Sequence, residues 1–353
     1  MTGASAIDAA GDDAVPDGRQ ARPLPWQRRF VADMLARRAG WPHALLVTGP
    51  AGIGKRRLAE VLAFALLCES PQVDGSACGG CPGCRYAAAG QHPDFRIVEP
   101  VEVDDEGVAK RVEAIVVDRI RALTEWVQVT SHRGGSKVAL IVPAERMNAA
   151  AANALLKTLE EPPAETFLIL VSHQPGRLPA TISSRCQRVD APRPSAAESA
   201  EWLAAEGVGE PERVLAQAAY APLAAIGLAG AEYQAERRSW LTAFAQPAAL
   251  SVAALGARID ALPRESRKEG LGAVIGWLSG WCTDLARVRF GGAPLQNGDM
   301  AAELAALAGS VAPVALFRYH RALLRARALL GHPLQPRLVA EALLIDYREL
   351  FGR

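Results

Sequence analysis

The fold is decided by the stretch His43-Ala-Leu-Leu-Val-Thr-Gly-Pro-Ala-Gly-Ile-Gly-Lys55, in which a short apolar run leads into a glycine-rich loop. The apolar run predicts a buried strand, and Gly49 to Lys55 match the pattern G-x-x-x-x-G-K. In that pattern, glycines let backbone N–H groups surround phosphate oxygens, and the lysine neutralises their charge. Apolar residues then recur at helical spacing from Leu58 to Leu66. This order predicts a P-loop fold, whose candidate nucleotide-binding residues are Gly49, Gly52, Gly54 and Lys55.

Two departures from an active ATPase predict that this site does not hydrolyse ATP. The residue after Lys55 should offer a hydroxyl to magnesium, but it is Arg56, a fixed cation that would compete with the metal. The apolar run from Val138 ends in Val142 and Pro143, where an ATPase carries acids that hold magnesium and polarise the attacking water. Glu145 is nearby in sequence but would need an altered backbone path. Whether the loop still binds ATP or ADP stays open, because its glycines and lysine survive.

The remaining pattern predicts an α/β unit followed by helices. Apolar runs at 94–98, 137–142 and 166–172 predict further strands, and helices are expected at 114–127 and 149–159. Buried strands that alternate with helices predict a parallel sheet covered on both faces. After Pro192 the sequence becomes rich in Ala and Leu and predicts no strand. In its segment 313–331 we expect a helix-bundle face made by Leu316, Phe317, His320, Leu323 and Leu324.

Four of the six cysteines form a candidate metal site. Cys78-Gly-Gly-Cys81-Pro-Gly-Cys84 separates three thiols by two residues each, and the intervening Gly and Pro residues favour tight bends. With Cys68 they can converge on one tetrahedral zinc. Four protein ligands leave no position for water, so we expect a structural zinc that pins residues 69–85. Free or redox-active thiols are the alternative, whereas a disulfide framework is disfavoured without a secretion signal.

Length and charge narrow the possibilities further. A chain of 353 residues suits two or three domains, and its net charge of +1 gives no whole-chain argument for nucleic-acid binding. Residues 1–22 are rich in Ala, Gly and Asp and contain no apolar segment. We expect them to be a disordered tail on a cytoplasmic protein without membrane segments.

Three further motifs complete a family resemblance. The cysteine set and the segments that follow it resemble the bacterial clamp-loader family of AAA+ proteins, on the motifs His92-Pro-Asp94, Asn153-Ala-Leu-Leu-Lys-Thr-Leu-Glu-Glu-Pro-Pro163 and Leu178-Pro-Ala-Thr-Ile-Ser-Ser-Arg-Cys186. The resemblance is strongest over 25–188. It continues more weakly to 336–344, which resembles the family's last collar helix.

The resemblance implies an architecture and a role. It implies an AAA+ domain at 23–190 with a zinc module at 68–85, a three-helix lid at 191–240 and a helical collar for oligomerisation at 241–353. The motor subunits gamma and tau carry acids at the positions of Val142 and Pro143, and the family's sensor arginine falls at Leu223. The chain therefore resembles a non-catalytic subunit, a stator, that assembles with gamma or tau and with delta to load the sliding clamp onto primed DNA. By the same resemblance, Arg185 is an arginine finger that acts in trans on ATP of a neighbouring gamma-type subunit; a local ion pair is its simpler alternative.

Two other functions compete with this interpretation. One is an active gamma-like ATPase with an atypical magnesium site, which Arg56, Val142, Pro143 and Leu223 together disfavour. The other is a zinc-dependent nucleic-acid module, which has only Tyr86 and Phe95 near the cysteines to stack on bases. The sequence shows no carboxylate set typical of a polymerase, so any DNA-directed DNA polymerase activity would belong to the assembly.

Overall fold

The computed structural model describes residues 22–103 and 109–352, and the chain divides into two compact units at Glu198 and Ser199. The tail predicted at 1–22 lies outside the described residues, apart from Arg22. Within the described part of the chain, every helix is too short or too polar to cross a bilayer.

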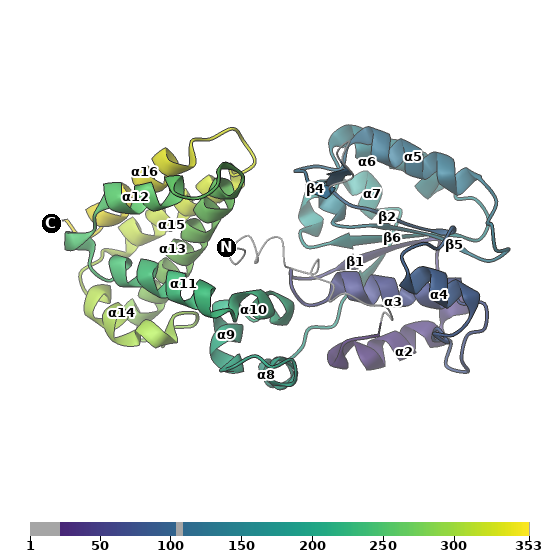
Figure 1. Ribbon diagram of the computed structural model, residues 1–353, viewed down its shortest axis with the longest axis horizontal. Helices are drawn as coiled ribbons and strands as arrows, with labels where there is room; N and C mark the ends of the chain where they lie inside the picture. Colours follow the sequence, from purple (N-terminus) through teal and green to yellow (C-terminus); the bar gives the residue numbers. More distant parts are fainter. Residues whose placement is uncertain (1–21, 104–108, 353) are drawn as a thin grey trace. The chain divides into compact units, whose positions relative to one another are not determined.

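The first unit is built on a five-stranded parallel sheet (Figure 1). Its strands lie in the order β2-β5-β6-β1-β7, with every neighbouring pair parallel. The central strands β1 (Ala44–Thr48) and β5 (Lys137–Ile141) are buried at every position, and β6 (Thr166–Ser172) at nearly every one. β2 (Phe95–Val98) forms one edge and β7 (Gln187–Asp190) the other. The predicted α/β P-loop architecture is therefore confirmed at the level of the sheet.

Helices cover both faces of this sheet (Figure 1). On one face, α2 (Arg28–Ala36) and α3 (Lys55–Leu67) pack against Leu45 and Val47, whose side chains point to that side of β1. On the other, α5 (Val117–Gln128) and α6 (Ala149–Glu160) pack against Leu46. Because side chains alternate along a strand, a continuous apolar run supplies both cores at once.

Several short elements were not predicted. They are η1 (Pro25–Gln27), α4 (Pro82–Ala88), the antiparallel pair β3 (Val101–Val103) and β4 (Ala109–Arg111), α7 (Ala180–Ser183) and β7. Only Val189 is buried in β7, so this edge strand lacks the apolar run that reveals the central ones. The helix expected from residue 114 begins at Val117, because Ile115 first forms a bridge with Met147.

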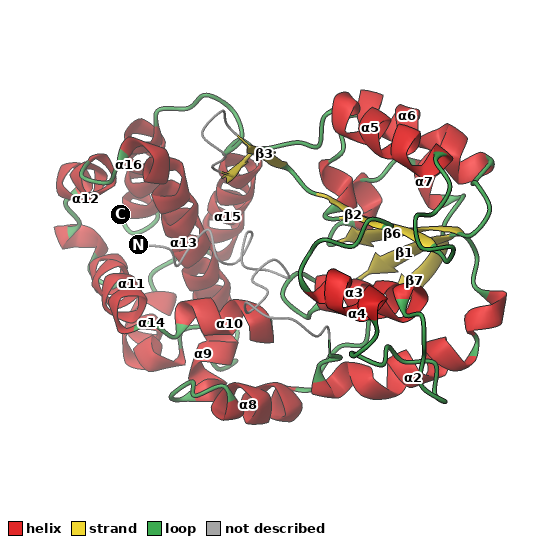
Figure 2. Ribbon diagram, turned by 45° about the vertical axis from the view of Figure 1, so that its right-hand side comes forward, coloured by secondary structure: helices red, strands yellow, loops and turns green. Residues whose placement is uncertain are grey.

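The second unit is all helical in its described residues, as the sequence predicted from Pro192 onward (Figure 2). α8 (Ala196–Ala205) begins before the boundary and packs with α9 (Pro211–Gln217) and α10 (Pro222–Leu228) around a small apolar cluster that includes Leu203 and Val214. A larger bundle surrounds Trp281 and Tyr347. Its helices are α11 (Ala231–Phe244), α12 (Val252–Asp260), α13 (Arg267–Arg289), α14 (Ala301–Ala308), α15 (Pro313–Ala328) and α16 (Pro336–Glu349).

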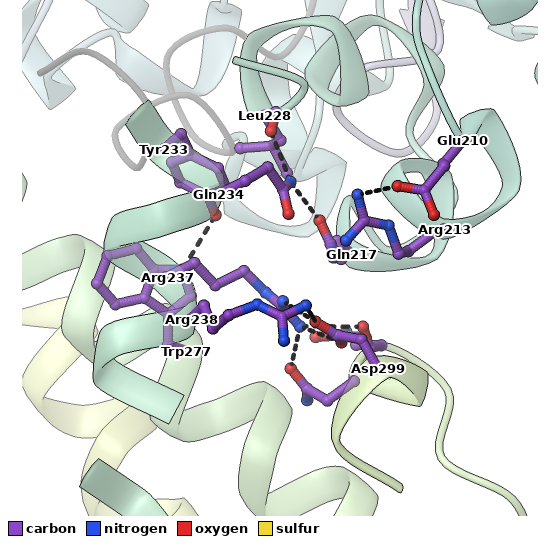
Figure 3. Close-up of polar contacts among 12 residues, drawn as sticks. Glu210, Arg213, Gln217, Leu228, Tyr233, Gln234, Arg237, Arg238, Trp277 and Asp299 are labelled. Carbon is purple, nitrogen blue, oxygen red and sulfur yellow. Dashed lines mark hydrogen bonds and ion pairs between the residues drawn. The ribbon is translucent and has the colours of Figure 1, made fainter. Parts of the chain in front are cut away.

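Helix α11 contacts both helical groups of this unit (Figure 3). The Gln234 side chain donates to Gln217 Oε1 at 2.6 Å and to the Leu228 carbonyl at 2.8 Å, both in the smaller group. Arg237 is buried and forms an ion pair with Asp299 at 2.8 Å in the larger bundle. The two groups are therefore joined through α11, and the boundary placed at residue 240 stays a prediction.

The apolar face predicted on α15 was only partly right. Leu316 and Leu323 are buried, together with Tyr319. Phe317 and Leu324, however, are 52% and 50% exposed. An α-helix has 3.6 residues per turn, so residues 316, 319 and 323 lie on one side of α15 and form its buried stripe. Phe317 and Leu324 lie beside this stripe and face away from the core.

Candidate functional site

The glycine loop lies between β1 and α3, with the backbone geometry its sequence predicts. Gly52 and Gly54 have φ angles of 77° and 87°, which favour glycine because a side chain would clash. Gly54 directly precedes the first helical residue, Lys55. A Cβ on Gly49 would approach Ile53 Cδ1 to 3.0 Å. The glycines are therefore needed for the turn from strand to helix itself.

The side chain of Lys55 points back to the glycine loop and bonds to it. Its side chain is buried, and Nζ donates to the Pro50 carbonyl at 2.5 Å. In an active P-loop the lysine serves phosphate oxygens. Here a backbone carbonyl of the same loop accepts one of its hydrogen bonds.

Arg56 is held between two carboxylates. Its Nε is 3.0 Å from Glu60 Oε1, one turn along α3, and its Nη1 pairs with Glu99, which follows β2. The Arg56 side chain is only 13% exposed. Burial raises the pKa of Glu60, while Arg56 opposes that shift. The position that should supply a magnesium ligand thus holds a cation whose charge is balanced inside the protein.

Neither Val142 nor Glu145, the residues at and just beyond the end of β5, offers an acid to this site. Val142 is fully buried, and its N–H donates to the Val98 carbonyl at 3.0 Å, which extends the sheet by one residue. Glu145 Oε1 accepts from the backbone N–H groups of His173 at 2.9 Å and Gln174 at 3.1 Å. The nearest acid in sequence therefore caps the chain after β6.

Two residues that sequence reasoning missed fix the end of the loop. Trp26 Nε1 donates to the Ile53 carbonyl at 3.1 Å, and Gln27 Nε2 donates to the Gly54 carbonyl at 2.7 Å. Gln27 is fully buried, and its Oε1 accepts from the Leu24 N–H at 3.2 Å. The only signal in the sequence is a polar residue placed beside a tryptophan before a helix, which is too common to identify a partner.

The four predicted cysteines come together as one cluster. All four Sγ atoms lie within 4.8 Å of one another, and the Cys68–Cys81 and Cys78–Cys84 pairs are each 3.9 Å apart. Zinc–sulfur bonds of about 2.3 Å in a tetrahedron place sulfurs about 3.8 Å apart, so the spacing fits this ion. No disulfide links these cysteines. The donor set can therefore hold a closed, structural metal centre.

Backbone donors surround the cluster. The N–H groups of Cys78, Cys81 and Cys84 each donate to a cysteine sulfur at 3.3 Å. Burial opposes ionisation of Cys81, but hydrogen bonds from the Cys84 and Glu69 N–H groups prevail and lower the pKa of its thiol to about 6. The thiolate is the form that binds metal. The backbone donors thus stabilise the thiolate of Cys81, whereas burial raises the pKa of the Cys68 and Cys84 thiols.

Arg185 lies directly after α7 and makes the local contacts of the simpler alternative. Its Nη2 is 2.5 Å from Glu160 Oε1, at the end of α6, and its Nη1 donates to the Thr181 carbonyl at 3.0 Å. The side chains of Arg185 and Glu160 are 35% and 50% exposed. An ion pair this accessible contributes about 0–1 kcal/mol, so another anion can replace Glu160 at little cost.

Comparisons with known proteins place this geometry in a family. The family described as "DNA polymerase III, delta subunit" matches residues 30–195. DNA polymerase III subunit delta' of Pseudomonas aeruginosa is 47% identical over 217 residues, which are 60% of this chain and 63% of that relative. The Escherichia coli subunit delta' is 34% identical over 301 residues, 83% of this chain and 84% of that relative. This chain belongs to the DNA polymerase III delta' family.

The family match covers most of the candidate site in the first unit, although Trp26 and Gln27 precede it. The segment 30–195 contains the glycine loop, the cysteine cluster and Arg185. DNA polymerase III subunit tau of Salmonella typhimurium is also similar, with 40% identity over 144 residues, 41% of this chain and 21% of tau. Leu223, in the second unit, is buried at the start of α10, and its correspondence to the family's sensor arginine stays a prediction.

Proposed function

We propose that this chain is the non-catalytic delta' subunit, the stator, of the DNA polymerase III clamp loader. It assembles with gamma or tau and with delta, and the ring loads the sliding clamp onto primed DNA during replication in the cytoplasm. Its AAA+ domain spans 23–190 and carries a structural zinc at Cys68, Cys78, Cys81 and Cys84. The lid at 191–240 leads to the collar at 241–353, which joins the ring.

The observation that carries the non-catalytic role is the environment of Arg56. The guanidinium occupies the position next to Lys55 and is held by Glu60 and Glu99. Phosphoryl transfer depends on magnesium and on a positioned water, and the glycine loop here has a fixed cation in place of the metal ligand. Val142 is buried in the sheet, and Glu145 is used as a cap. We therefore expect the isolated chain not to hydrolyse ATP.

Arg185 gives this chain a use in a ring despite its own degenerate site. A guanidinium supplied in trans stabilises the charge that develops on the γ-phosphate, and such fingers raise rates by about 10³–10⁵ in well-studied cases. Arg185 is partly exposed, and its ion-pair partner Glu160 is exposed as well. Its guanidinium can therefore exchange Glu160 for a stronger anion, such as a phosphate of the neighbouring subunit's ATP. Lysine would keep the charge but lose the planar fork.

The test is reconstitution with gamma and delta, followed by measurement of DNA-stimulated ATPase and clamp loading. Adding the wild-type chain should stimulate both. Rings with Arg185→Ala should assemble and bind zinc but lose most turnover at the ATP site that this arginine serves, and Arg185→Lys should also be impaired. If the wild-type chain adds no stimulation, the clamp-loader role is wrong.

Glu160→Gln is the matched control for the arginine. If Arg185 matters only through its ion pair with Glu160, both substitutions should impair the ring equally. If Arg185 acts in trans, Glu160→Gln rings should keep wild-type activity while Arg185→Ala rings fail. Arg177→Ala, at another exposed arginine of the same segment, controls for a general loss of positive charge. A Lys55→Ala-sensitive ATPase in the isolated chain would instead favour an active gamma-like subunit.

A further inference from the structure

Glu69 connects the cysteine cluster to the rest of the first unit. It follows the ligand Cys68, and its backbone N–H donates to the sulfur of Cys81. Its carboxylate accepts from the backbone N–H of Gly83, between two other cysteines, and is 2.5 Å from Arg133 Nε. One residue therefore bonds to the cluster through its backbone and to a distant arginine through its side chain.

Arg133 lies in the segment 129–136, between α5 and β5. Besides Glu69, its guanidinium covers the ring of Tyr86 on α4, 5.3 Å from the ring centre. Two side chains that flank the cysteines thus hold the same arginine. The contact with an aromatic face is typical of a cation–π interaction, which adds to the ion pair.

Asp94 fixes the backbone that carries Arg133. Its two carboxylate oxygens accept from the N–H groups of His132 at 2.8 Å and Arg133 at 3.0 Å. Asp94 is 1% exposed and directly precedes β2, while Lys137 at the end of the segment begins β5. This carboxylate therefore joins the start of β2, an edge of the sheet, to the segment that leads into the neighbouring strand β5.

We propose that Glu69, Arg133 and Asp94 form a latch that couples metal binding at the cysteine cluster to the order of residues 129–136 and of edge strand β2. The inference rests on the proposed zinc. One zinc ion with four thiolates carries a net negative charge, and the Glu69 carboxylate beside it adds another. Arg133 offsets this charge and holds Glu69 in the orientation that presents its N–H to Cys81. Arg133 is a positioning residue for the metal centre.

Metal affinity gives the first test. Zinc is titrated against a chromogenic chelator with the full chain and its variants. Because residues that support metal ligands from outside typically contribute 10–100-fold in affinity, Arg133→Gln should bind zinc about 10-fold more weakly or worse. Arg121→Gln is the matched control, since Arg121 forms an exposed ion pair with Asp118 on α5. Equal zinc affinity of Arg133→Gln and the wild type overturns the proposal.

A double variant separates charge from folding. If Arg133 acts by offsetting the Glu69 carboxylate, then Glu69→Gln combined with Arg133→Gln should regain much of the affinity lost in Arg133→Gln alone. A misfolded Arg133→Gln chain would not be rescued in this way. A double variant as weak as the single one rejects the electrostatic role of Arg133.

Hydrogen exchange gives the second test, and it distinguishes failure of the latch from failure of the proposed zinc site. On removal of zinc from the wild type, amides of 69–85, of 129–136 and of β2 should lose protection together, while β1 and the glycine loop at 44–55 keep theirs. If only 69–85 responds, the metal is present but the latch is wrong. If the carefully purified chain contains no zinc, the proposed metal itself fails.

Discussion

Replacing Arg56 with Met should destabilise the first unit in a pH-dependent way. The substitution keeps an unbranched side chain of similar length but removes the cation between Glu60 and Glu99. In the wild type the Arg56 and Glu60 side chains are 13% and 12% exposed, so Glu60 would be left as a buried carboxylate without its partner. Glu99 is 29% exposed and retains water.

The magnitude follows from this burial. Removal of one partner from a fully buried ion pair costs about 3–5 kcal/mol. The cost here is smaller because water reaches Glu99 and because Glu60 can take up a proton, and we expect a loss of about 1–3 kcal/mol in the free energy of unfolding near neutral pH. Arg121→Met, at an ion pair whose side chains are 65% and 81% exposed, should lose about 0.5 kcal/mol or less.

The dependence on pH has a definite sign. Burial raises the pKa of Glu60 above 4.5 in the folded chain, so its contribution to stability is complete below 4.5 and is lost as the pH rises through the folded-state pKa. Arg56 counteracts that rise, and its removal raises the pKa of Glu60 further. The difference between wild type and variant should therefore be small near pH 4.5 and grow as the pH increases.

Urea unfolding of the full chain at about pH 5 and about pH 8, with hydrogen exchange of the α3 amides as the readout, measures the difference in stability between the wild type and the variant. The Arg56→Met deficit should be larger at the higher pH, whereas that of Arg121→Met should not change. If both variants are equally stable, or if the Arg56→Met deficit is the same at both pH values, Glu60 does not depend on Arg56. The interpretation of Arg56 as a cation balanced by buried carboxylates would then be wrong.

Two further predictions concern the supports of the site. Gln27→Ala removes the buried donor to the Gly54 carbonyl and should cost about 1–3 kcal/mol, with faster hydrogen exchange in 49–55; unchanged exchange there would show that the Trp26 contact suffices. Cys81→Ser should release zinc, measured by elemental analysis, and loosen residues 69–85, while circular dichroism shows a largely intact sheet; full metal retention would exclude Cys81 as a ligand.

The parts of the fold that the sequence predicts are those whose signals are local. β1 and β5 lie at the centre of a parallel sheet, so both faces are buried and the strands read as continuous apolar runs. β7 joins the same sheet but borders solvent, and its one buried residue, Val189, gives no periodic pattern. On α15, periodicity predicted the helix and two of its buried residues, Leu316 and Leu323, but wrongly placed Phe317 and Leu324 on the same face.

In the candidate site, too, the sequence predicted the residues that are close together in the chain but not the contacts between distant ones. The cysteines are close in sequence, and their spacing alone predicted a cluster that the structure confirms. Arg56 was recognised as a departure, but one of its two partners, Glu99, lies 43 residues away and carries no mark in the sequence. Gln27 is likewise identified only by burial and by the backbone group it satisfies, and the motif that contains Asp94 did not reveal which backbone groups its carboxylate binds. Contacts between a side chain and a distant backbone have no sequence pattern, because any residue can supply the carbonyl or the N–H.

These contacts also give the loop a structural role that does not depend on nucleotide hydrolysis. An active phosphate loop has donors and a lysine that are satisfied when nucleotide is bound. In this chain Lys55 bonds to Pro50, and Trp26 and Gln27 bond to the carbonyls of Ile53 and Gly54. The glycines remain necessary, because Gly52 and Gly54 make the left-handed turn that connects β1 to α3. The same residues thus have a structural reason to be kept that is independent of hydrolysis, and a glycine-loop motif alone is no argument for an active ATPase. The residue after the lysine and the partners it finds in the fold are the more informative observation.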